Sequence, residues 1–145
     1  MKYLLLALLG LSIQSIAEEV KFQCEHKISS TVHKYPDKDE GTYLLVLDKT
    51  AMTLQRYAGT TPYYDEPFTC SISPNTEWYN CIKQTFSSYS KEWVADKYSL
   101  NRRDLSVKLF HATAKKAYES TMDYLIHGVW TSYNGQCEIA KPLQF

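Results

Sequence analysis

The sequence lacks the residue spacings that hold metals or carry common hydrolytic chemistry. It has no Cys-x-x-Cys pair, no His-x-x-x-His or His-Glu-x-x-His group and no Gly-x-Ser-x-Gly elbow. These absences argue against a structural zinc site, a redox-active dithiol and a serine hydrolase with the usual elbow. We therefore expect no cofactor and no bound metal, and enzyme activity is the weakest of the functional hypotheses.

Charge of one sign and long apolar runs are also scarce. The 16 Lys and Arg residues balance the 16 Asp and Glu residues. A chain without a basic excess offers little to a nucleic acid or an anionic membrane surface. No apolar stretch is long enough to hold the chain in a bilayer. We expect no nucleic-acid partner, no stable membrane anchor and a monomer.

The one apolar run lies at the N-terminus. Lys2 precedes the apolar residues 4–13, and the small residues Ser15 and Ala17 follow at the spacing of a secretory cleavage site. This pattern predicts a cleavable signal peptide over residues 1–17 and one exported domain over residues 18–145, either periplasmic or secreted. Export would place the cysteines in an oxidising compartment, where disulfides form.

Four cysteines can pair in three ways. Cys70 and Cys81 lie on adjacent expected strands that a short turn separates. Cys24 lies in the first expected strand and Cys137 in the last. These two strands become neighbours if the sheet closes on itself, so we favour the pairs Cys24–Cys137 and Cys70–Cys81. The other two pairings stay open on the sequence alone.

Strand patterns dominate the chain after residue 17. Apolar and polar side chains alternate over residues 20–28, which is typical of a strand with one solvent-facing side. The expected strands cover residues 20–28, 42–47, 51–57, 66–73, 78–86, 93–100, 105–111, 122–133 and 136–140. Such short runs predict an all-β fold, a single antiparallel meander that closes into a small barrel or a two-sheet sandwich of about eight strands.

Two expected turns connect these strands, and one segment fits either a strand or a helix. Residues 101–104 have the length and the side-chain acceptors of a type I hairpin turn, and Asn134-Gly135 predicts another turn before the last strand. Residues 112–125 fit a strand followed by a loop, which we favour, but helical spacing is also present in Ala114, Ala117, Tyr118, Met122 and Leu125. The alternative is a short helix near residues 112–120.

The three tryptophans are expected in the core. Trp78, Trp93 and Trp130 each fall in a strand-like run. Burial of an indole ring stabilises a fold more than a surface contact does.

Aromatic residues give the strongest functional signal. The chain has 12 Tyr, 5 Phe and 3 Trp, and part of this set gathers in residues 57–68 together with Pro62 and Pro67. Tyrosine offers a large contact area at a small entropic cost, and proline stiffens the loop that presents it. The candidate binding residues are Tyr57, Tyr63, Tyr64 and Phe68. The alternative is that these rings plug one end of the barrel.

Arg102 and Arg103 form a second candidate contact at the expected hairpin turn. Guanidinium groups suit a carboxylate or phosphate partner. The alternative for such charges is that they only keep the protein soluble.

The favoured function is an exported, non-enzymatic protein that binds a protein or another envelope component through these loops. One alternative is a carrier of a small apolar ligand inside the barrel. A secreted hydrolase is the other, and Asp123 with His127 is the nearest approach to a catalytic pair.

The layout of a leader followed by a disulfide-tied meander resembles that of small exported β-barrel proteins, including periplasmic lysozyme inhibitors. The Ser-Gly-x-x-Tyr loop motif of those inhibitors is absent here, and residues 59–64 do not match it. The resemblance therefore assigns no residue.

Overall fold

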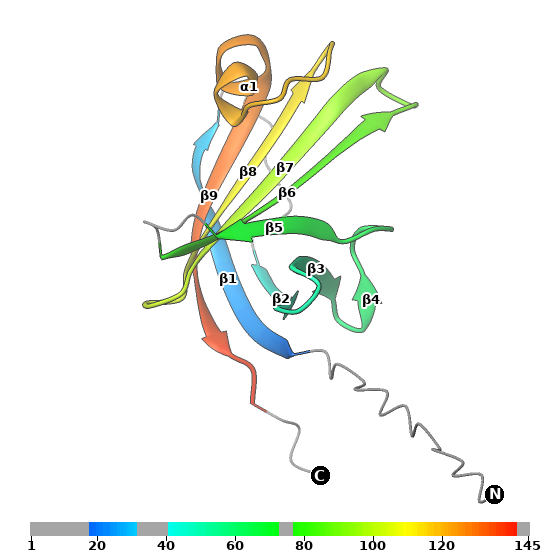
Figure 1. The fold of residues 1–145 in the computed structure, drawn as a ribbon. Coiled ribbons are helices and arrows are strands. Elements are labelled where there is room, and N and C mark those ends of the chain that lie inside the picture. Colours follow the sequence, from blue (N-terminus) through cyan, green and yellow to red (C-terminus); the bar gives the residue numbers. More distant parts are fainter. Residues whose placement is uncertain (1–17, 32–40, 73–76, 142–145) are drawn as a thin grey trace, which may run out of the picture.

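The computed structural model describes residues 18–31, 41–72 and 77–141, so the expected signal peptide over residues 1–17 lies outside the described residues. The elements, shown in Figure 1, are β1 (Glu19–Thr31), β2 (Gly41–Asp48), β3 (Thr53–Ala58), β4 (Thr61–Pro62), β5 (Phe68–Ile72), β6 (Trp78–Ser87), β7 (Glu92–Asn101), β8 (Ser106–Ala114), α1 (Thr121–His127) and β9 (Val129–Ile139). Within these ranges no helix has the length and apolar character needed to cross a membrane.

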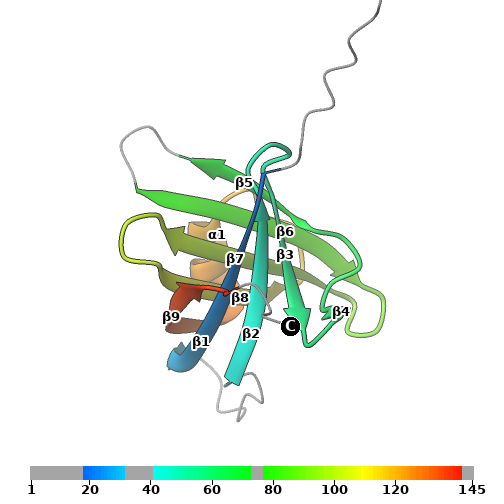
Figure 2. The ribbon, with the colours of Figure 1, turned by 90° about the horizontal axis from the view of Figure 1, so that it is seen from below.

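The strands form a closed antiparallel β-barrel of eight strands, with β4 as a short extra strand paired to β3. Each barrel strand pairs with the next one along the chain, and β9 returns to pair with β1. In Figure 2, β1, β2 and β3 run steeply across β6, β7 and β8, so that the barrel is flattened into two crossing layers. The predicted all-β meander is confirmed, and the barrel is the architecture that it adopts.

Alternating side chains fill the barrel interior. In β2, for example, Tyr43, Leu45 and Leu47 are buried, and the residues between them are only partly buried. This period of two is what a strand with one face toward a core requires. The other large side chains that are almost fully buried in this core are Phe68, Tyr98, Tyr133, Leu54, Leu100 and Val107.

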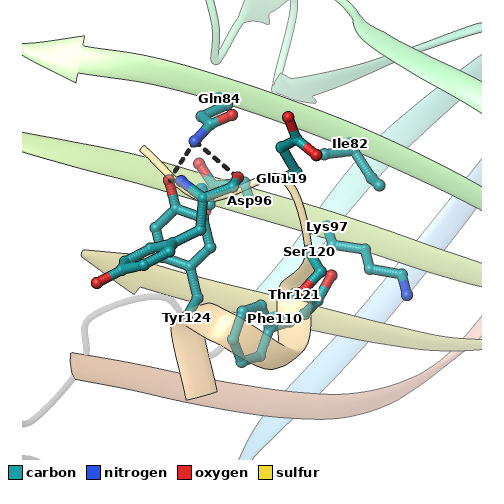
Figure 3. A pocket seen from close by; sticks show the side chains of 11 residues that line it. Ile82, Gln84, Asp96, Lys97, Phe110, Glu119, Ser120, Thr121 and Tyr124 are labelled. Carbon is teal, nitrogen blue, oxygen red and sulfur yellow. Dashed lines mark hydrogen bonds between the residues drawn. The ribbon is translucent and has the colours of Figure 1, made fainter. Parts of the chain in front are cut away.

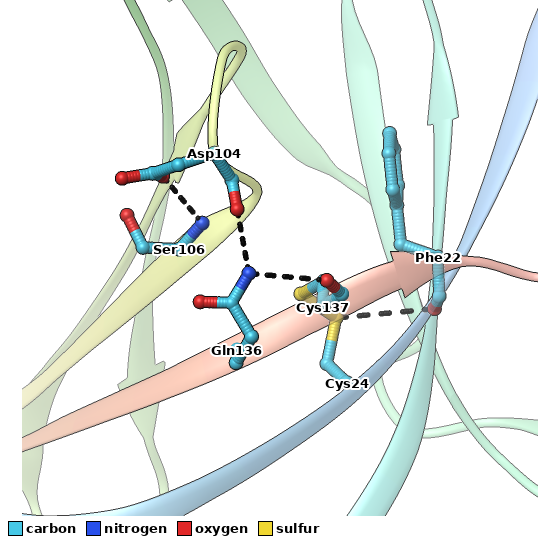
Figure 4. The surroundings of a disulfide bond; sticks show 6 residues. All are labelled: Phe22, Cys24, Asp104, Ser106, Gln136 and Cys137. Carbon is cyan, nitrogen blue, oxygen red and sulfur yellow. Dashed lines mark hydrogen bonds between the residues drawn. A yellow bond between two sulfur atoms is a disulfide. The ribbon is translucent and has the colours of Figure 1, made fainter.

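Both favoured disulfides are confirmed. Cys24 on β1 is bonded to Cys137 on β9, and the two residues are paired in register where the last strand meets the first. Figure 4 shows this bond beside Gln136, whose side-chain amide donates to the carbonyl of Asp104 at 2.6 Å. Cys70 on β5 is bonded to Cys81 on β6. Two disulfides indicate an oxidising environment, extracellular or periplasmic.

The favoured strand followed by a loop holds for residues 112–120, whereas the strand expected from residue 122 is wrong, and the helix of the alternative lies further along the chain than residues 112–120. β8 continues to Ala114, and α1 occupies Thr121–His127. The helix begins there because the Ser120 hydroxyl accepts a hydrogen bond from the backbone N–H of Asp123 at 3.1 Å, which caps the first turn. Tyr124 then packs on the outer face of the sheet, where alanines leave room for its ring.

The turn predicted at Asn134-Gly135 is also wrong. β9 runs straight through both residues, and Asn134 pairs with Lys108 of β8 on one side and with Lys27 of β1 on the other. Because β9 has a strand on each edge, its backbone groups find partners along its whole length. This tertiary pairing overrides the local preference of Asn-Gly for a tight turn. The predicted turn at residues 101–104 does join β7 to β8.

The expectation that the tryptophans form the core is wrong. Trp78, Trp93 and Trp130 are only partly buried. Trp130 stacks on Phe110 at a centroid distance of 6.1 Å on the outer face of the sheet, and Trp93 packs beside the exposed ring of Phe86. Each tryptophan occupies a strand position whose side chain points to the outer face of the sheet. Tyrosines fill the interior instead.

Gly128 ends α1 at a point where a side chain has no space. A Cβ atom at this position would lie 2.6 Å from the carbonyl oxygen of Thr113 and 2.8 Å from that of Tyr124. Both are backbone atoms, so neither can move aside cheaply. We expect Gly128→Ala to lower the free energy of unfolding by about 1–3 kcal/mol, measured by urea denaturation. Gly59→Ala is a poor comparison because its φ is positive, so Ala117→Gly, an exposed loop change, serves as the control. An unchanged stability of Gly128→Ala would contradict the close approach.

Candidate binding site

The loop between β3 and β5 carries Tyr63 and Tyr64, two of the four aromatic candidates, while Tyr57 lies in β3 and Phe68 begins β5. In an up-and-down barrel this loop and the β7–β8 turn lie at opposite ends of the strands, and Figure 1 shows them on opposite sides of the molecule. The aromatic residues and the Arg102-Arg103 pair are therefore two separate surfaces.

Aromatic rings connect the loop surface to the core. The ring of Tyr63 meets Tyr64 edge-on at a centroid distance of 4.9 Å, and Tyr64 meets Phe68 in the same way at 4.9 Å. Phe68 then contacts Tyr98 at 5.2 Å. Exposure falls along this series from 47% at Tyr63 to 0% at Phe68 and Tyr98. Edge-to-face pairs of this kind add stability beyond the area that they bury, so the outermost ring has a firm support.

A buried arginine supports the same ring. The guanidinium carbon of Arg56, on β3, lies 4.4 Å from the ring centroid of Tyr63 and 4.7 Å from that of Tyr43. Its Nη1 donates to the Tyr98 hydroxyl at 3.1 Å. Planar stacking on aromatic faces is a contact that guanidinium makes well. Arg56 thus joins the interior tyrosines to the exposed one.

Three hydrogen bonds tie the loop backbone to the barrel. The N–H of Tyr63 donates to the Arg56 carbonyl at 2.8 Å, and the Gln55 side-chain amide donates to the Tyr64 carbonyl at 2.9 Å. The ammonium group of Lys83, from β6, donates to the Glu66 carbonyl at 2.6 Å. These bonds fix residues 63–66 of the loop, so its aromatic side chains are held before any partner arrives.

Burial raises the pKa values of Tyr43 and Tyr98 well above the ordinary range of tyrosine. The nearby Arg56 acts in the opposite direction, because a positive charge favours tyrosinate, but the loss of hydration is the larger effect. Both hydroxyl groups therefore stay neutral at physiological pH, and they act as dipoles around the arginine.

The structure separates the candidate residues that sequence grouped together. Tyr63 and Tyr64 lie together, and Phe68 supports them from within the core. Tyr57 is partly buried on β3 beside Arg56, at the alternate position that faces outward. It therefore lies on the other side of the strand from Tyr63.

Arg102 and Arg103 are exposed but held by neighbours. Arg102 lies over the ring of Tyr79 at 5.5 Å, and Arg103 forms an ion pair with Glu77. The backbone N–H of Arg102 also donates to the carbonyl of Glu77. Exposed ion pairs contribute little stability, and these contacts leave both guanidinium groups at the surface.

Sequence reasoning missed Arg56. A positive residue in a strand is usually taken as solvent-facing, and it has no motif around it. One signal was present. Leu54 and Arg56 are two residues apart in a strand, so their side chains point to the same face, and an inward Leu54 places Arg56 inward as well.

Sequence reasoning also missed a paired histidine. His111 on β8 lies directly opposite Asp96 on β7, and its Nδ1 is 2.6 Å from the largely buried carboxylate of Asp96. A carboxylate can only accept, so Nδ1 carries the proton that is donated. The sequence did hold one signal for this pair, because the turn predicted at residues 101–104 places Asp96 and His111 on the two strands of one hairpin. We assign the pair a stabilising role, since a buried carboxylate needs a partner.

Asp123 and His127, which only the disfavoured hydrolase hypothesis would use, each have another partner in the structure. Asp123 accepts from the Ser120 hydroxyl at 2.8 Å as part of the helix cap, and His127 stacks on Tyr118. Among residues 18–31, 41–72 and 77–141, no three His, Cys, Asp or Glu side chains are grouped in a way that could hold a metal ion.

Comparisons with known proteins add no relative. No family model matches the chain, and neither a curated protein nor a solved structure matches it.

Proposed function

We propose that this protein is an exported, non-enzymatic binding module that engages a protein or another envelope component through the loop between β3 and β5. Its leader over residues 1–17 delivers it to the oxidising compartment in which its two disulfides form. Tyr63 is the central contact residue, with Tyr64 and Arg56 as its support.

The observation that carries the proposal is the support of an exposed tyrosine by buried groups. Tyr63 is nearly half exposed, yet it stacks on Arg56 and meets Tyr64 edge-on. Ordering an exposed side chain costs entropy, and the contacts with Arg56 and Tyr64 offset that cost within the fold. A binding residue gains from this order, since a ring that is already ordered loses less freedom when a partner docks.

The alternative function, a carrier of a small apolar ligand inside the barrel, is less favoured. Tyr98, Tyr133 and Phe68 occupy interior positions of the described strands and are almost fully buried. A ligand would have to displace some of these packed rings.

Substitution of Tyr63 by serine tests the proposal. The oxidised protein and its Tyr63→Ser variant are immobilised and exposed to an envelope extract of the producing cells, and retained proteins are quantified by mass spectrometry. We expect the variant to lose about ten-fold or more of the captured partner, as at a binding hot spot. Its free energy of unfolding should fall by only about 1 kcal/mol, the value of the lost cation–π contact.

Tyr89→Ser is the matched control for this experiment. Tyr89 lies in the β6–β7 turn and is 98% exposed, without a place in the loop. It should retain the partner as the parent protein does. Equal capture of the partner by Tyr63→Ser and the parent, or equal loss of capture in both serine variants, would contradict the assignment of the loop as the binding surface.

A further inference from the structure

A cleft lies outside the barrel, on the face that α1 overhangs. It consists of two adjoining hollows that share Lys97, Phe110 and Thr121. The upper hollow, drawn in Figure 3, is narrow, with a volume of about 40 Å³ between the sheet and residues 118–121, and the lower hollow is wider, with about 300 Å³. The lower hollow continues over β8 and β9 to Ser132 and Asn134. This surface is separate from the aromatic loop proposed above.

The overhang that forms the cleft is pinned in place. The side-chain amide of Gln84, on β6, donates to the carbonyl of Tyr118 at 3.2 Å and to the hydroxyl of Tyr124. Figure 3 shows these two bonds crossing from the sheet to the overhanging segment. The ring of Tyr118 also packs edge-on against Tyr124. The cleft is therefore a fixed feature of the fold.

The floor of the cleft combines a flat ring with two ammonium groups. Phe110 is partly buried, and its ring stacks on Trp130, a diagonal neighbour on the same outer face of the sheet. In the register of β7 and β8, Lys97 lies opposite Phe110 and Ser99 lies opposite Lys108. The two lysines therefore occupy diagonal positions on neighbouring strands. Diagonal side chains on one face of a sheet start about 7–8 Å apart. One anionic group can therefore contact both.

Hydroxyl and amide groups surround this floor. Thr121 lines both hollows, and Ser99, Ser132 and Asn134 line the lower one. Each of these groups can donate and accept hydrogen bonds. Lys108 is further held by the ring of Trp78, which lies 5.1 Å from its ammonium nitrogen.

The charges favour an anion. Two lysines line the cleft, and the carboxylate of Asp96 is engaged by His111. Glu119 is then the one further carboxylate among the lining residues, at the rim of the upper hollow. A ligand that matches this site carries a negative charge, several hydroxyl groups and an apolar face that packs on a ring.

We propose that this cleft binds a short acidic saccharide, a chain of pyranose rings that bear carboxylate groups. The C–H face of a pyranose packs on Phe110, its carboxylate lies between Lys97 and Lys108, and its hydroxyl groups bond to the side chains of Thr121 and Asn134. Charge-assisted bonds to the lysines supply the larger part of the affinity.

Isothermal titration with a galacturonic acid tetramer tests the proposal, with the neutral tetramer maltotetraose as the comparison. We expect the oxidised protein to bind the acidic tetramer with a Kd below about 1 mM and the neutral one about ten-fold more weakly. The double variant Lys97→Gln/Lys108→Gln should bind the acidic tetramer about ten-fold more weakly than the parent. Phe110→Leu, which keeps an apolar side chain but removes the ring face, should weaken binding of both tetramers.

Two controls separate this site from general charge and from the loop. Lys21→Gln removes an exposed lysine of β1 outside the cleft and should leave the Kd unchanged, as should Tyr63→Ser. Far-ultraviolet circular dichroism and thermal melting confirm that each variant is folded. Absence of binding to the acidic tetramer would overturn the proposal, and so would equal Kd values for the lysine double variant and Lys21→Gln. Equal affinity for a glutamate hexamer would show recognition of charge alone and would overturn the saccharide assignment.

Discussion

Replacement of both Cys24 and Cys137 by alanine is expected to lower the free energy of unfolding by about 5 kcal/mol. The disulfide closes a loop of 113 residues, and the chain-entropy model gives this value for a loop of that length. Domains of ordinary stability unfold with about 5–15 kcal/mol, so the variant loses a large part of its stability. Urea denaturation of the oxidised parent and the variant, followed by tryptophan fluorescence, measures the difference.

The second disulfide supplies the comparison within the same fold. Cys70–Cys81 spans only 11 residues, for which the same model gives about 3 kcal/mol. The Cys70→Ala/Cys81→Ala variant should therefore be more stable than the Cys24→Ala/Cys137→Ala variant by about 2 kcal/mol. A smaller loss from the long-loop variant than from the short-loop variant would contradict the role of the Cys24–Cys137 bond in closing the barrel.

The position of the long-range disulfide adds a reason to the entropic one. The two cysteines lie within the ladder that joins β1 to β9, the single contact between the first and last strands of the barrel. All other neighbouring strands in the barrel follow one another along the chain, apart from the short β4 between β3 and β5. Pairing of β1 with β9 must close the longest loop in the fold, and the disulfide makes that closure permanent.

The fold could be predicted where local pattern and tertiary pairing agree. Alternation defined most strands, and Cys24 and Cys137 at the two ends of the domain favoured a closed sheet before any strand order was known. Local signals failed in Asn134-Gly135, because the partners on both sides of β9 are distant in sequence. Local signals also failed at residues 121–127, where alternation suggested a strand. A helix forms there because Ser120 caps its first turn and Tyr124 packs against alanines of the sheet.

The candidate site could be predicted only in part. Composition pointed to the loop of Tyr63 and Tyr64, since aromatic density is visible in a sequence. The support from Arg56 was not visible, because it depends on which face of β3 turns inward and on Tyr98, which lies 42 residues away. The cleft beneath α1 was hidden for the same reason, as its lining residues come from four strands, the segment before the helix and the helix itself.

The tyrosines around Arg56 predict a loss of stability in alkali. In the folded protein the pKa values of Tyr43 and Tyr98 lie well above the ordinary value of about 10, because burial disfavours the charged form. Their contribution to stability is complete below pH 10 and declines as pH rises above it, since only the unfolded chain can then release these protons. At pH 11 each tyrosine should lower the free energy of unfolding by about 1.4 kcal/mol, or about 3 kcal/mol together.

Urea denaturation at pH 8 and pH 11 measures this loss, and phenylalanine substitutions assign it. Tyr43→Phe/Tyr98→Phe should be less stable than the parent at pH 8, because the bond from Arg56 to the Tyr98 hydroxyl is lost. Its further loss between pH 8 and pH 11 should be smaller than that of the parent by about 3 kcal/mol. Tyr89→Phe removes a fully exposed hydroxyl and should follow the parent at both pH values. If the double variant and the parent lose the same stability in alkali, burial does not hold these two hydroxyl groups neutral, and the packing around Arg56 that supports Tyr63 must differ from the one described.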